Sequence, residues 1–163
     1  MHIKCKLTDG LTTFKNLHFC GKFYKKDIKL KYEVTIGLGG NVGDVKRRFE
    51  HLFIFFKRDK RVEIIKSSLI LKNPPFGYLL QDDFLNSVMI LRTNMQPIVF
   101  LDYLLRVEKK FGRKRSFDNA PRTLDLDIIF FDKKIINKKR LKVPHPSWSK
   151  RESVVIPLMD INR

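Results

Sequence analysis

The sequence predicts an α+β domain with a ferredoxin-like βαββαβ core, in which helices pack on the faces of a mostly antiparallel sheet. Two observations lead to this prediction. Two segments of the 163-residue chain carry apolar residues at helical spacing, and four others are rich in strand-forming residues. Along the chain these segments follow the order strand, helix, strand, strand, helix, strand, which is that of the split βαβ arrangement.

The first strand and helix of this core flank a glycine-rich turn. Residues 32–37 are typical of a strand, and residues 37–44 form the turn, with Asn41 or Asp44 suited to cap the helix. A turn of this kind can hold an anion on its backbone N–H groups, but this one lacks the residues of known phosphate-binding loops. The helix is predicted from a stripe of apolar residues, namely Val45, Phe49, Leu52, Phe53 and Phe56.

The second part of the core repeats the strand and helix signals. Residues 62–71 and 84–93 are predicted strands, separated by Asn73-Pro74-Pro75-Phe76-Gly77, whose prolines cannot continue a central strand. Pro97 suits the start of the second helix and Gly112 its end. The apolar stripe of that helix consists of Phe100, Leu101, Leu104, Leu105, Val107 and Phe111.

The last strand is predicted over residues 124–131, after a polar loop. An edge strand over 134–137, a rigid loop at Pro144-His145-Pro146 and a short helix over 148–155 follow. The first thirty residues are rich in lysine and weakly periodic, and they are predicted to form a hairpin or an appended strand pair.

Composition limits the class of protein. The chain is predicted to comprise a basic N-terminal extension, residues 1–30, and a single domain, residues 31–163. Its net charge of +17 favours polyanions but is spread along the whole sequence. Cys5 and Cys20 are expected to be reduced thiols, because their spacing with the nearby histidines matches no usual zinc pattern. With no apolar run near the roughly 20 residues of a membrane span and no signal peptide, we expect a cytoplasmic protein.

The pair Asp125 and Asp127 is the most informative chemical feature. Successive strand side chains point to opposite faces, so both carboxylates share one face. The other face receives Leu124, Leu126, Ile128 and Phe130. Two adjacent anions repel each other and are costly to desolvate, so a hard divalent cation is the expected partner, although a solvated strand face is the alternative. Together with the upstream arginines, the pair suggests phosphoryl transfer.

Several other residues are candidates for the same site. Glu108 lies near the end of the second helix, where a negative charge opposes the helix dipole, so it is expected to pair with a cation or to serve the site. His145, held between prolines, is suited to bind phosphate. Phe84 and Asn86 share a strand face, which suits a flat heterocycle, but core packing explains Phe84 equally well.

These pieces together resemble the 6-hydroxymethyl-7,8-dihydropterin pyrophosphokinase family of folate biosynthesis. The resemblance covers roughly residues 33–160. The segment Pro-Arg-Thr-Leu-Asp-Leu-Asp is its most specific part. The matching segments occur in the family's order: residues 37–44, 73–77 and 84–86, Glu108 with Gly112-Arg113, residues 120–127, residues 143–146 with Arg151, and Pro157-Leu158.

The resemblance implies that residues 31–163 catalyse transfer of pyrophosphate from ATP to the hydroxymethyl group of the dihydropterin, with release of AMP. Asp125 and Asp127 would hold two Mg²⁺ ions, and the pterin hydroxyl would attack the β-phosphorus in line. Arg113 and Arg115 would be catalytic arginines of a mobile loop. The expected ATP contacts are Arg115, Arg122, Ile128, Arg140, His145 and Arg151. The expected pterin contacts are Asn73, Pro74, Phe76, Phe84, Asn86 and Asp125.

The chain also departs from the family pattern. Ser153 replaces an aromatic residue that would close the pterin site, leaving Phe76, Tyr78 or Trp148 to replace it, and Gly40 stands where serine is usual. We expect a monomer with small-molecule substrates and no obligate nucleic acid or membrane partner. Two alternatives are a ferredoxin-like nucleic-acid-binding protein, favoured by the net charge, and a related transferase acting on another heterocycle.

Overall fold

The computed structural model describes residues 2–8, 10–16, 19–23, 30–75, 77, 79–114 and 120–162. Three α-helices are seen in these ranges: α1 (Val45–Arg58), α2 (Pro97–Lys110) and α3 (Glu152–Ile161), the last preceded by a 3₁₀ turn, η1 (Trp148–Lys150). The strands are β1 (His2–Thr8), β2 (Leu11–Asn16), β3 (Gly21–Lys22), β4 (Tyr32–Gly40), β5 (Val62–Ser67), β6 (Ile70–Asn73), β7 (Phe84–Thr93), β8 (Asp125–Phe131), β9 (Ile136–Lys138) and β10 (Leu141–Val143).

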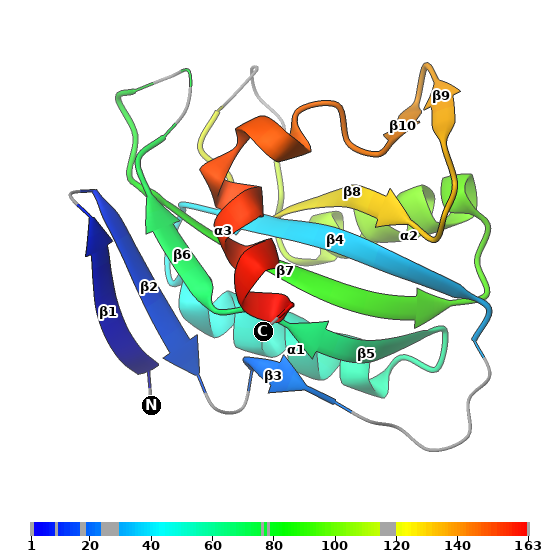
Figure 1. Cartoon of the computed structure of the whole chain (residues 1–163), viewed down its shortest axis with the longest axis horizontal. Helices are drawn as coiled ribbons and strands as arrows, with labels where there is room; N and C mark the ends of the chain where they lie inside the picture. The colour runs from blue at the N-terminus through cyan, green and yellow to red at the C-terminus, as the bar shows by residue number, and fades with distance from the viewer. Residues whose placement is uncertain are drawn as a thin grey trace.

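The central strands confirm the predicted fold class. β4 pairs with both β8 and β7, and β7 pairs in turn with β5, all antiparallel. This gives the order β8-β4-β7-β5, in which the first and third core strands lie side by side as in a ferredoxin-like sheet. The described sheet continues from β7 through β6 and β2 to β1, and β3 pairs with β5 (Figure 1).

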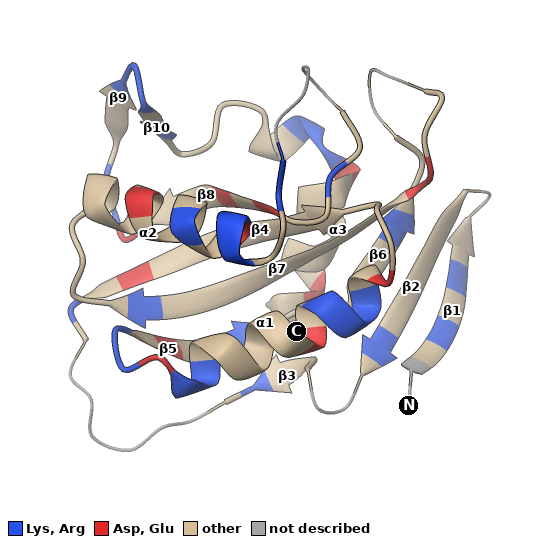
Figure 2. Cartoon of the chain, turned by 180° about the vertical axis from the view of Figure 1, so that it is seen from behind, with Lys and Arg blue, Asp and Glu red and all other residues tan. Residues whose placement is uncertain are grey.

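Helices α1 and α2 cover one face of the sheet, and α3 crosses the other face in front of β6 and β7 (Figures 1 and 2). All five predicted apolar residues of α1 are buried. In α2 the buried set is Phe100, Tyr103, Leu104, Val107 and Glu108, so Tyr103 takes a core position that the sequence stripe did not include. The end of α3 is fixed to the sheet because the Asp160 carboxylate accepts a hydrogen bond from the Leu69 N–H at 2.8 Å.

The predicted start of α1 and both predicted ends of α2 are confirmed. Of the two candidate caps for α1, Asp44 is the one that caps, since its carboxylate accepts from the Arg47 N–H at 3.0 Å. Pro97 is the first residue of α2. Gly112 follows the end of α2 with a φ of +80°, a left-handed conformation that glycine adopts at little cost.

Three details of the sequence prediction are wrong. The predicted strand 62–71 is two strands, because the chain breaks at Ser68, whose hydroxyl accepts from the Val88 N–H. The predicted edge strand 134–137 is instead part of a separate β9–β10 hairpin. The predicted helix 148–155 is η1 followed by α3.

The predicted face of Phe130 is also wrong. Thr35 and Ile36 of β4 pair with Phe130 and Ile128, so Ile129 is an extra residue in β8. A bulge of this kind shifts the alternation of the side chains that follow it. Phe130 therefore packs edge-on against Trp148, with ring centroids 5.0 Å apart, and Phe131 takes the core position.

The hairpin predicted within the first thirty residues is confirmed over β1 and β2. β2 pairs with β6, so the hairpin extends the sheet instead of standing apart from it. Phe14 and Phe19 belong to the buried core of the molecule. Among the described residues, no helix combines the length and apolar character needed to cross a membrane.

Candidate active site

Asp125 and Asp127 lie on β8 beside glycines of β4. Gly39 pairs with Asp125 on one side and with Asn86 of β7 on the other, and Gly37 pairs with Asp127. A methyl group on Gly39 would lie only 3.0 Å from Oδ1 of Asn86. The absence of a side chain at Gly39 therefore leaves the face that carries Asp125 and Asn86 open.

Two of the predicted arginines hold Asp125. Arg122 Nη1 donates to Oδ2 of Asp125 at 2.7 Å, and Arg113 Nη1 forms a short hydrogen bond to Oδ1. Both guanidinium groups come from the loop that joins α2 to β8. Asp125 is thus paired with a guanidinium group on each oxygen. The divalent cation predicted for the carboxylate pair stays a prediction.

Glu108 joins this group from α2. Its carboxylate is buried and accepts from the Leu126 N–H at 2.8 Å and from Arg113 Nη1 at 2.5 Å. Burial raises the pKa of Glu108 to about 7, an effect that the Leu126 N–H and Arg113 only partly offset. The expectation that Glu108 pairs with a loop arginine is confirmed, and the pairing places Arg113 at Asp125.

Asp127 lies in a less favourable environment than Asp125. Burial and the charge of Asp125 raise its pKa, and the positive charges of Arg151, Arg113 and Arg122 act against that rise. Burial lowers the pKa of His145, and the positive charge of nearby Arg151 lowers it further. The predicted phosphate-binding residues Arg151 and His145 thus lie around the carboxylate pair, from the segment that follows β10.

Predicted pterin residues lie next to Asp125. Asn86 Nδ2 donates to Oδ1 of Asn73 at 2.7 Å, and Asn73 Nδ2 donates to the Pro74 carbonyl at 2.8 Å. Phe84, two residues before Asn86 on β7, lies beneath the Arg122 guanidinium at 5.2 Å. An aromatic ring and two amides therefore border the carboxylate pair.

Asn41 connects three loops around the site, a function that the sequence analysis missed. Its buried side chain accepts from the Arg122 N–H and donates to Gln81 Oε1 and the Asp82 carbonyl, all within 2.9–3.0 Å. Gly40 allows the loop before β8 to approach, since a methyl group there would lie 2.6 Å from the Thr123 carbonyl oxygen. An asparagine in a glycine-rich turn was the available signal, but its partners are distant in sequence.

Of the remaining predicted site residues, Arg140 and Ile128 are among those that the structure describes. Arg140 lies in the β9–β10 turn and donates to Asp102 of α2 at 2.5 Å. The Ile128 side chain is buried in the core below the site. Arg115 and Phe76, and with them Tyr78, lie outside the described residues.

Comparison with known proteins gives the family. The model of the family described as 7,8-dihydro-6-hydroxymethylpterin-pyrophosphokinase (HPPK) matches residues 35–163. The chain belongs to the HPPK family. This membership confirms the family inferred from the motifs and the prediction that the protein is a pyrophosphokinase enzyme.

Individual members of the HPPK family are also similar to this chain over most of its length. The 2-amino-4-hydroxy-6-hydroxymethyldihydropteridine pyrophosphokinase of Campylobacter jejuni is 42% identical over 149 residues, which cover 91% of this chain and 95% of the relative. The protein of the same name from Helicobacter pylori is 40% identical over 86% of this chain and 87% of its own. The one from Aquifex aeolicus is 38% identical over 78% and 79%.

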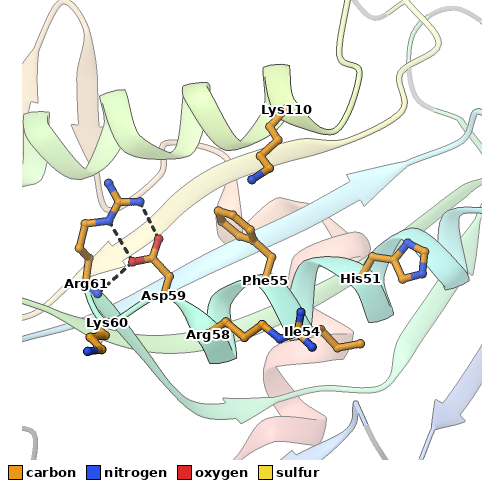
Figure 3. Close-up of a pocket in the computed structure, with 8 residues that line it drawn as sticks. All are labelled: His51, Ile54, Phe55, Arg58, Asp59, Lys60, Arg61 and Lys110. Atoms are coloured by element: carbon orange, nitrogen blue, oxygen red, sulfur yellow. Dashed lines mark hydrogen bonds and ion pairs between the residues drawn. The ribbon is translucent and has the colours of Figure 1, made fainter.

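A depression of about 640 Å³ lies away from these residues, between the second half of α1 and the last residue of α2 (Figure 3). It is lined by His51, Ile54, Phe55, Arg58, Asp59, Lys60, Arg61 and Lys110. Arg58 and Lys110 belong to the last turns of their helices, where cations are stabilised by the helix dipole. The basic character of this depression is explained by helix ends, and it contains none of the predicted HPPK site residues.

Proposed function

We propose that this protein transfers the pyrophosphoryl group of ATP to the hydroxymethyl group of 6-hydroxymethyl-7,8-dihydropterin, releasing AMP in folate biosynthesis. The observation that carries the proposal is the convergence of three groups at one end of the sheet: the carboxylates of β8, the arginines before them, and the amides and ring of β6 and β7. The carboxylates suit a metal ion, the arginines suit the phosphates of ATP, and the amides and the ring suit the pterin heterocycle.

The arginine side supports phosphate binding. Arg122 Nε and the Thr123 hydroxyl are buried and lack hydrogen-bond partners among the described residues. Buried polar groups are normally satisfied, so such atoms at a site point to a ligand. Guanidinium groups suit phosphate oxygens because they donate two parallel hydrogen bonds.

The carboxylate pair fits Mg²⁺. This cation is usually bound through one or two carboxylates, with waters and substrate phosphates completing its octahedron. Two carboxylates on one strand face therefore suit Mg²⁺ that is shared with a triphosphate. We propose that Asp125 and Asp127 hold two such ions, which would neutralise charge on the phosphates and lower the pKa of the attacking hydroxyl.

The remaining residues position the reactants. Asn86 and Asn73 present amide groups to the edge of the pterin, and Phe84 offers a ring for stacking. Arg113 and Arg122 pair with Asp125 and would pair with phosphate oxygens when ATP is bound. The hydroxymethyl oxygen then forms a bond to the β-phosphorus, the bond from that phosphorus to the α,β-bridging oxygen breaks, and the hydroxyl proton is released.

The first test measures AMP and ADP formed from ATP and Mg²⁺, with and without the pterin alcohol. The proposal predicts AMP that depends on the pterin, with no ADP. Asp125→Ala and Asp127→Ala should abolish it while leaving the fold intact. Glu33→Ala is the matched control, because Glu33 is an exposed carboxylate on β4 that pairs with exposed Arg92 at 3.4 Å.

Other outcomes would contradict the proposal. Pterin-independent hydrolysis to ADP would indicate another reaction, and full activity in both aspartate variants would exclude the two-metal assignment. The division of the chain at residue 30, the cytoplasmic location and the monomeric state stay predictions.

A further inference from the structure

The β1–β2 hairpin lies at the edge of the sheet next to the strand that carries Asn73. The hairpin precedes residues 35–163, which the family model matches. The match to the Campylobacter jejuni relative is 149 residues long, so it must include part of the first 34 residues. The hairpin segment therefore lies outside the part matched by the family model, and the match to this relative includes at least the last two residues of β2.

The turn of this hairpin contacts the start of the β6–β7 loop. Gly10 lies in the turn with a φ of +84°, and a methyl group on it would lie 3.5 Å from Cγ of Pro74. The backbone at Gly10 thus packs near van der Waals range of the proline ring. In Figure 1 the hairpin turn and the β6–β7 loop lie at the same end of the sheet, which is also the end where the α2–β8 loop lies.

From Pro74 a short series of contacts leads to the proposed pterin site. The Pro74 carbonyl accepts from Asn73 Nδ2, and Asn73 Oδ1 accepts from Asn86 Nδ2. The orientation of both amides therefore depends on where the Pro74 carbonyl lies. A hydrogen-bonded amide pair presents fixed donors and acceptors only if its last partner is itself fixed.

β2 also supports the base of the β6–β7 loop. Thr12 of β2 pairs with Lys72 of β6, and the Lys72 ammonium group lies 3.1 Å from the Asp83 carboxylate at the other end of the loop. The hairpin thus contacts the strand where the loop begins, and that strand is joined by an ion pair to the residue where the loop ends.

We propose that the β1–β2 hairpin is a positioning element for the pterin side of the active site, acting through Pro74 on the amides of Asn73 and Asn86. The proposal rests on the function proposed above for Asn73 and Asn86. It predicts that a disturbance of the hairpin turn weakens recognition of the pterin and leaves recognition of ATP unchanged, because the arginines and carboxylates belong to other segments.

The test compares Gly10→Val with Gly21→Val. Both glycines have positive φ and lie in the first thirty residues, but Gly21 has nothing within 4 Å of an added methyl group. Both variants therefore introduce backbone strain at a positive φ. Only in Gly10→Val do the valine methyl groups, which extend beyond a Cβ already in contact with Pro74, press on the proline ring. Should Gly10→Val not fold, Gly10→Leu, paired with Gly21→Leu, introduces less strain because leucine is not β-branched, and it still adds side-chain atoms beyond the Cβ that contacts Pro74.

The expected result is a rise of about fivefold or more in KM for the pterin in Gly10→Val, since small misplacements of substrate-positioning groups are costly. KM for ATP should be unchanged, and Gly21→Val should resemble the wild type in both constants. Equal changes in both variants, or an equal rise in both KM values for Gly10→Val, would overturn the proposal.

Hydrogen exchange separates this proposal from the proposed function. Amides of Asn73 and residues 79–83 should exchange faster in Gly10→Val than in Gly21→Val. Unchanged exchange would overturn the positioning function of the hairpin. If the wild-type protein releases no pterin-dependent AMP, the proposed function fails, and the exchange comparison still decides whether the hairpin positions the loop.

Discussion

Two carboxylate–arginine clusters in this protein have opposite electrostatic character. At the end of α1, Asp59 accepts hydrogen bonds from the Arg61 side chain, from the Arg61 N–H and from the Tyr103 hydroxyl of α2. These donors, the Arg61 side chain above all, lower the pKa of Asp59 to about 2. In the candidate active site, by contrast, the pKa values of both Glu108 and Asp127 are raised, although Arg113, Arg122 and Arg151 are near.

The two clusters differ in how many carboxylates share the available hydrogen-bond donors. One carboxylate has several donors at α1, so its charged form is favoured and the cluster holds α1 to α2. Three carboxylates, Glu108, Asp125 and Asp127, share the donors of the active site, and burial adds a cost to each charge. A site in which the negative charge of the carboxylates is unfavourable is suited to bind a cation. Perturbed pKa values are common at functional sites.

The largest expected effect is that of Asp127→Asn. Turnover should fall by about 10³-fold or more, because a charge that would hold metal is lost. The metal-free variant should nevertheless be more stable than the wild type at pH 7, since a disfavoured negative charge has been removed. Thermal unfolding in EDTA, beside steady-state turnover with Mg²⁺, measures both quantities.

Equal destabilisation by Asp127→Asn and Asp59→Asn would remove the contrast between the clusters. Glu33→Gln serves as a control for loss of a carboxylate, since its exposed pair with Arg92 contributes little to stability. Its melting temperature and turnover should both equal those of the wild type.

Arg113→Ala should have the next largest effect. Its guanidinium joins Glu108 to Asp125 and is proposed to bind phosphate in catalysis. Turnover should fall by about 10²-fold, and the pKa of Glu108 should rise further because a positive charge is lost. NMR titration of the Glu108 carboxyl, compared with Lys109→Ala in the same helix turn, tests the second effect. An unchanged Glu108 titration would show that Arg113 does not act on it.

Much of the fold follows from local residue patterns. Pro97 and Gly112 set the ends of α2, and the β7 bounds agree with the predicted 84–93, because helix ends and turns are determined by residues near in sequence. The positions of Asp125 and Asp127 on one strand were predictable for the same reason. The extra residue at Ile129 was not, since it depends on how β8 pairs with β4.

The connections between segments could not be predicted in the same way. The Glu108 carboxylate accepts a hydrogen bond from the Leu126 N–H, and the Asn41 side chain accepts one from the Arg122 N–H. In each case the two partners are too far apart in sequence for a local pattern to reveal the contact. The sequence did suggest a reason to examine Glu108, because a negative charge near the C-terminal end of a helix is unfavourable. For Asn41 the only signal was its place in a glycine-rich turn, and it was considered only as a helix cap.

Asp59→Asn should have a moderate effect, confined to stability. Loss of the charge weakens the hydrogen bonds from Arg61 and Tyr103, which should cost about 1–2 kcal/mol and lower the melting temperature by a few degrees. Turnover should be unchanged, because Asp59 lines the depression between α1 and α2 and not the candidate active site. A substantial loss of turnover at full folding would mean that this depression affects catalysis.

The smallest expected effect is a pH dependence of stability that differs between the clusters. The folded pKa of Glu108, about 7, is above the roughly 4.3 of an unfolded glutamate, so the folded state binds more protons between these values. Stability from this group is therefore greatest at the acid end of the window and is lost as the pH rises through 7. Asp59 acts in a lower window, where its contribution is lost only as the pH falls from about 4 toward 2.

Comparison of Glu108→Gln with the wild type isolates this contribution, because the lowered pKa of His145 opposes it in both proteins alike. In EDTA at pH 8 the variant should melt a few degrees higher than the wild type, since about 1 kcal/mol corresponds to roughly 2–4 °C at this chain length. At pH 5 the wild-type Glu108 is protonated and the two melting temperatures should converge. A difference that stays constant from pH 8 to pH 5 would mean that Glu108 keeps its charge in the folded protein and that the active-site cluster is as well satisfied as the one at Asp59.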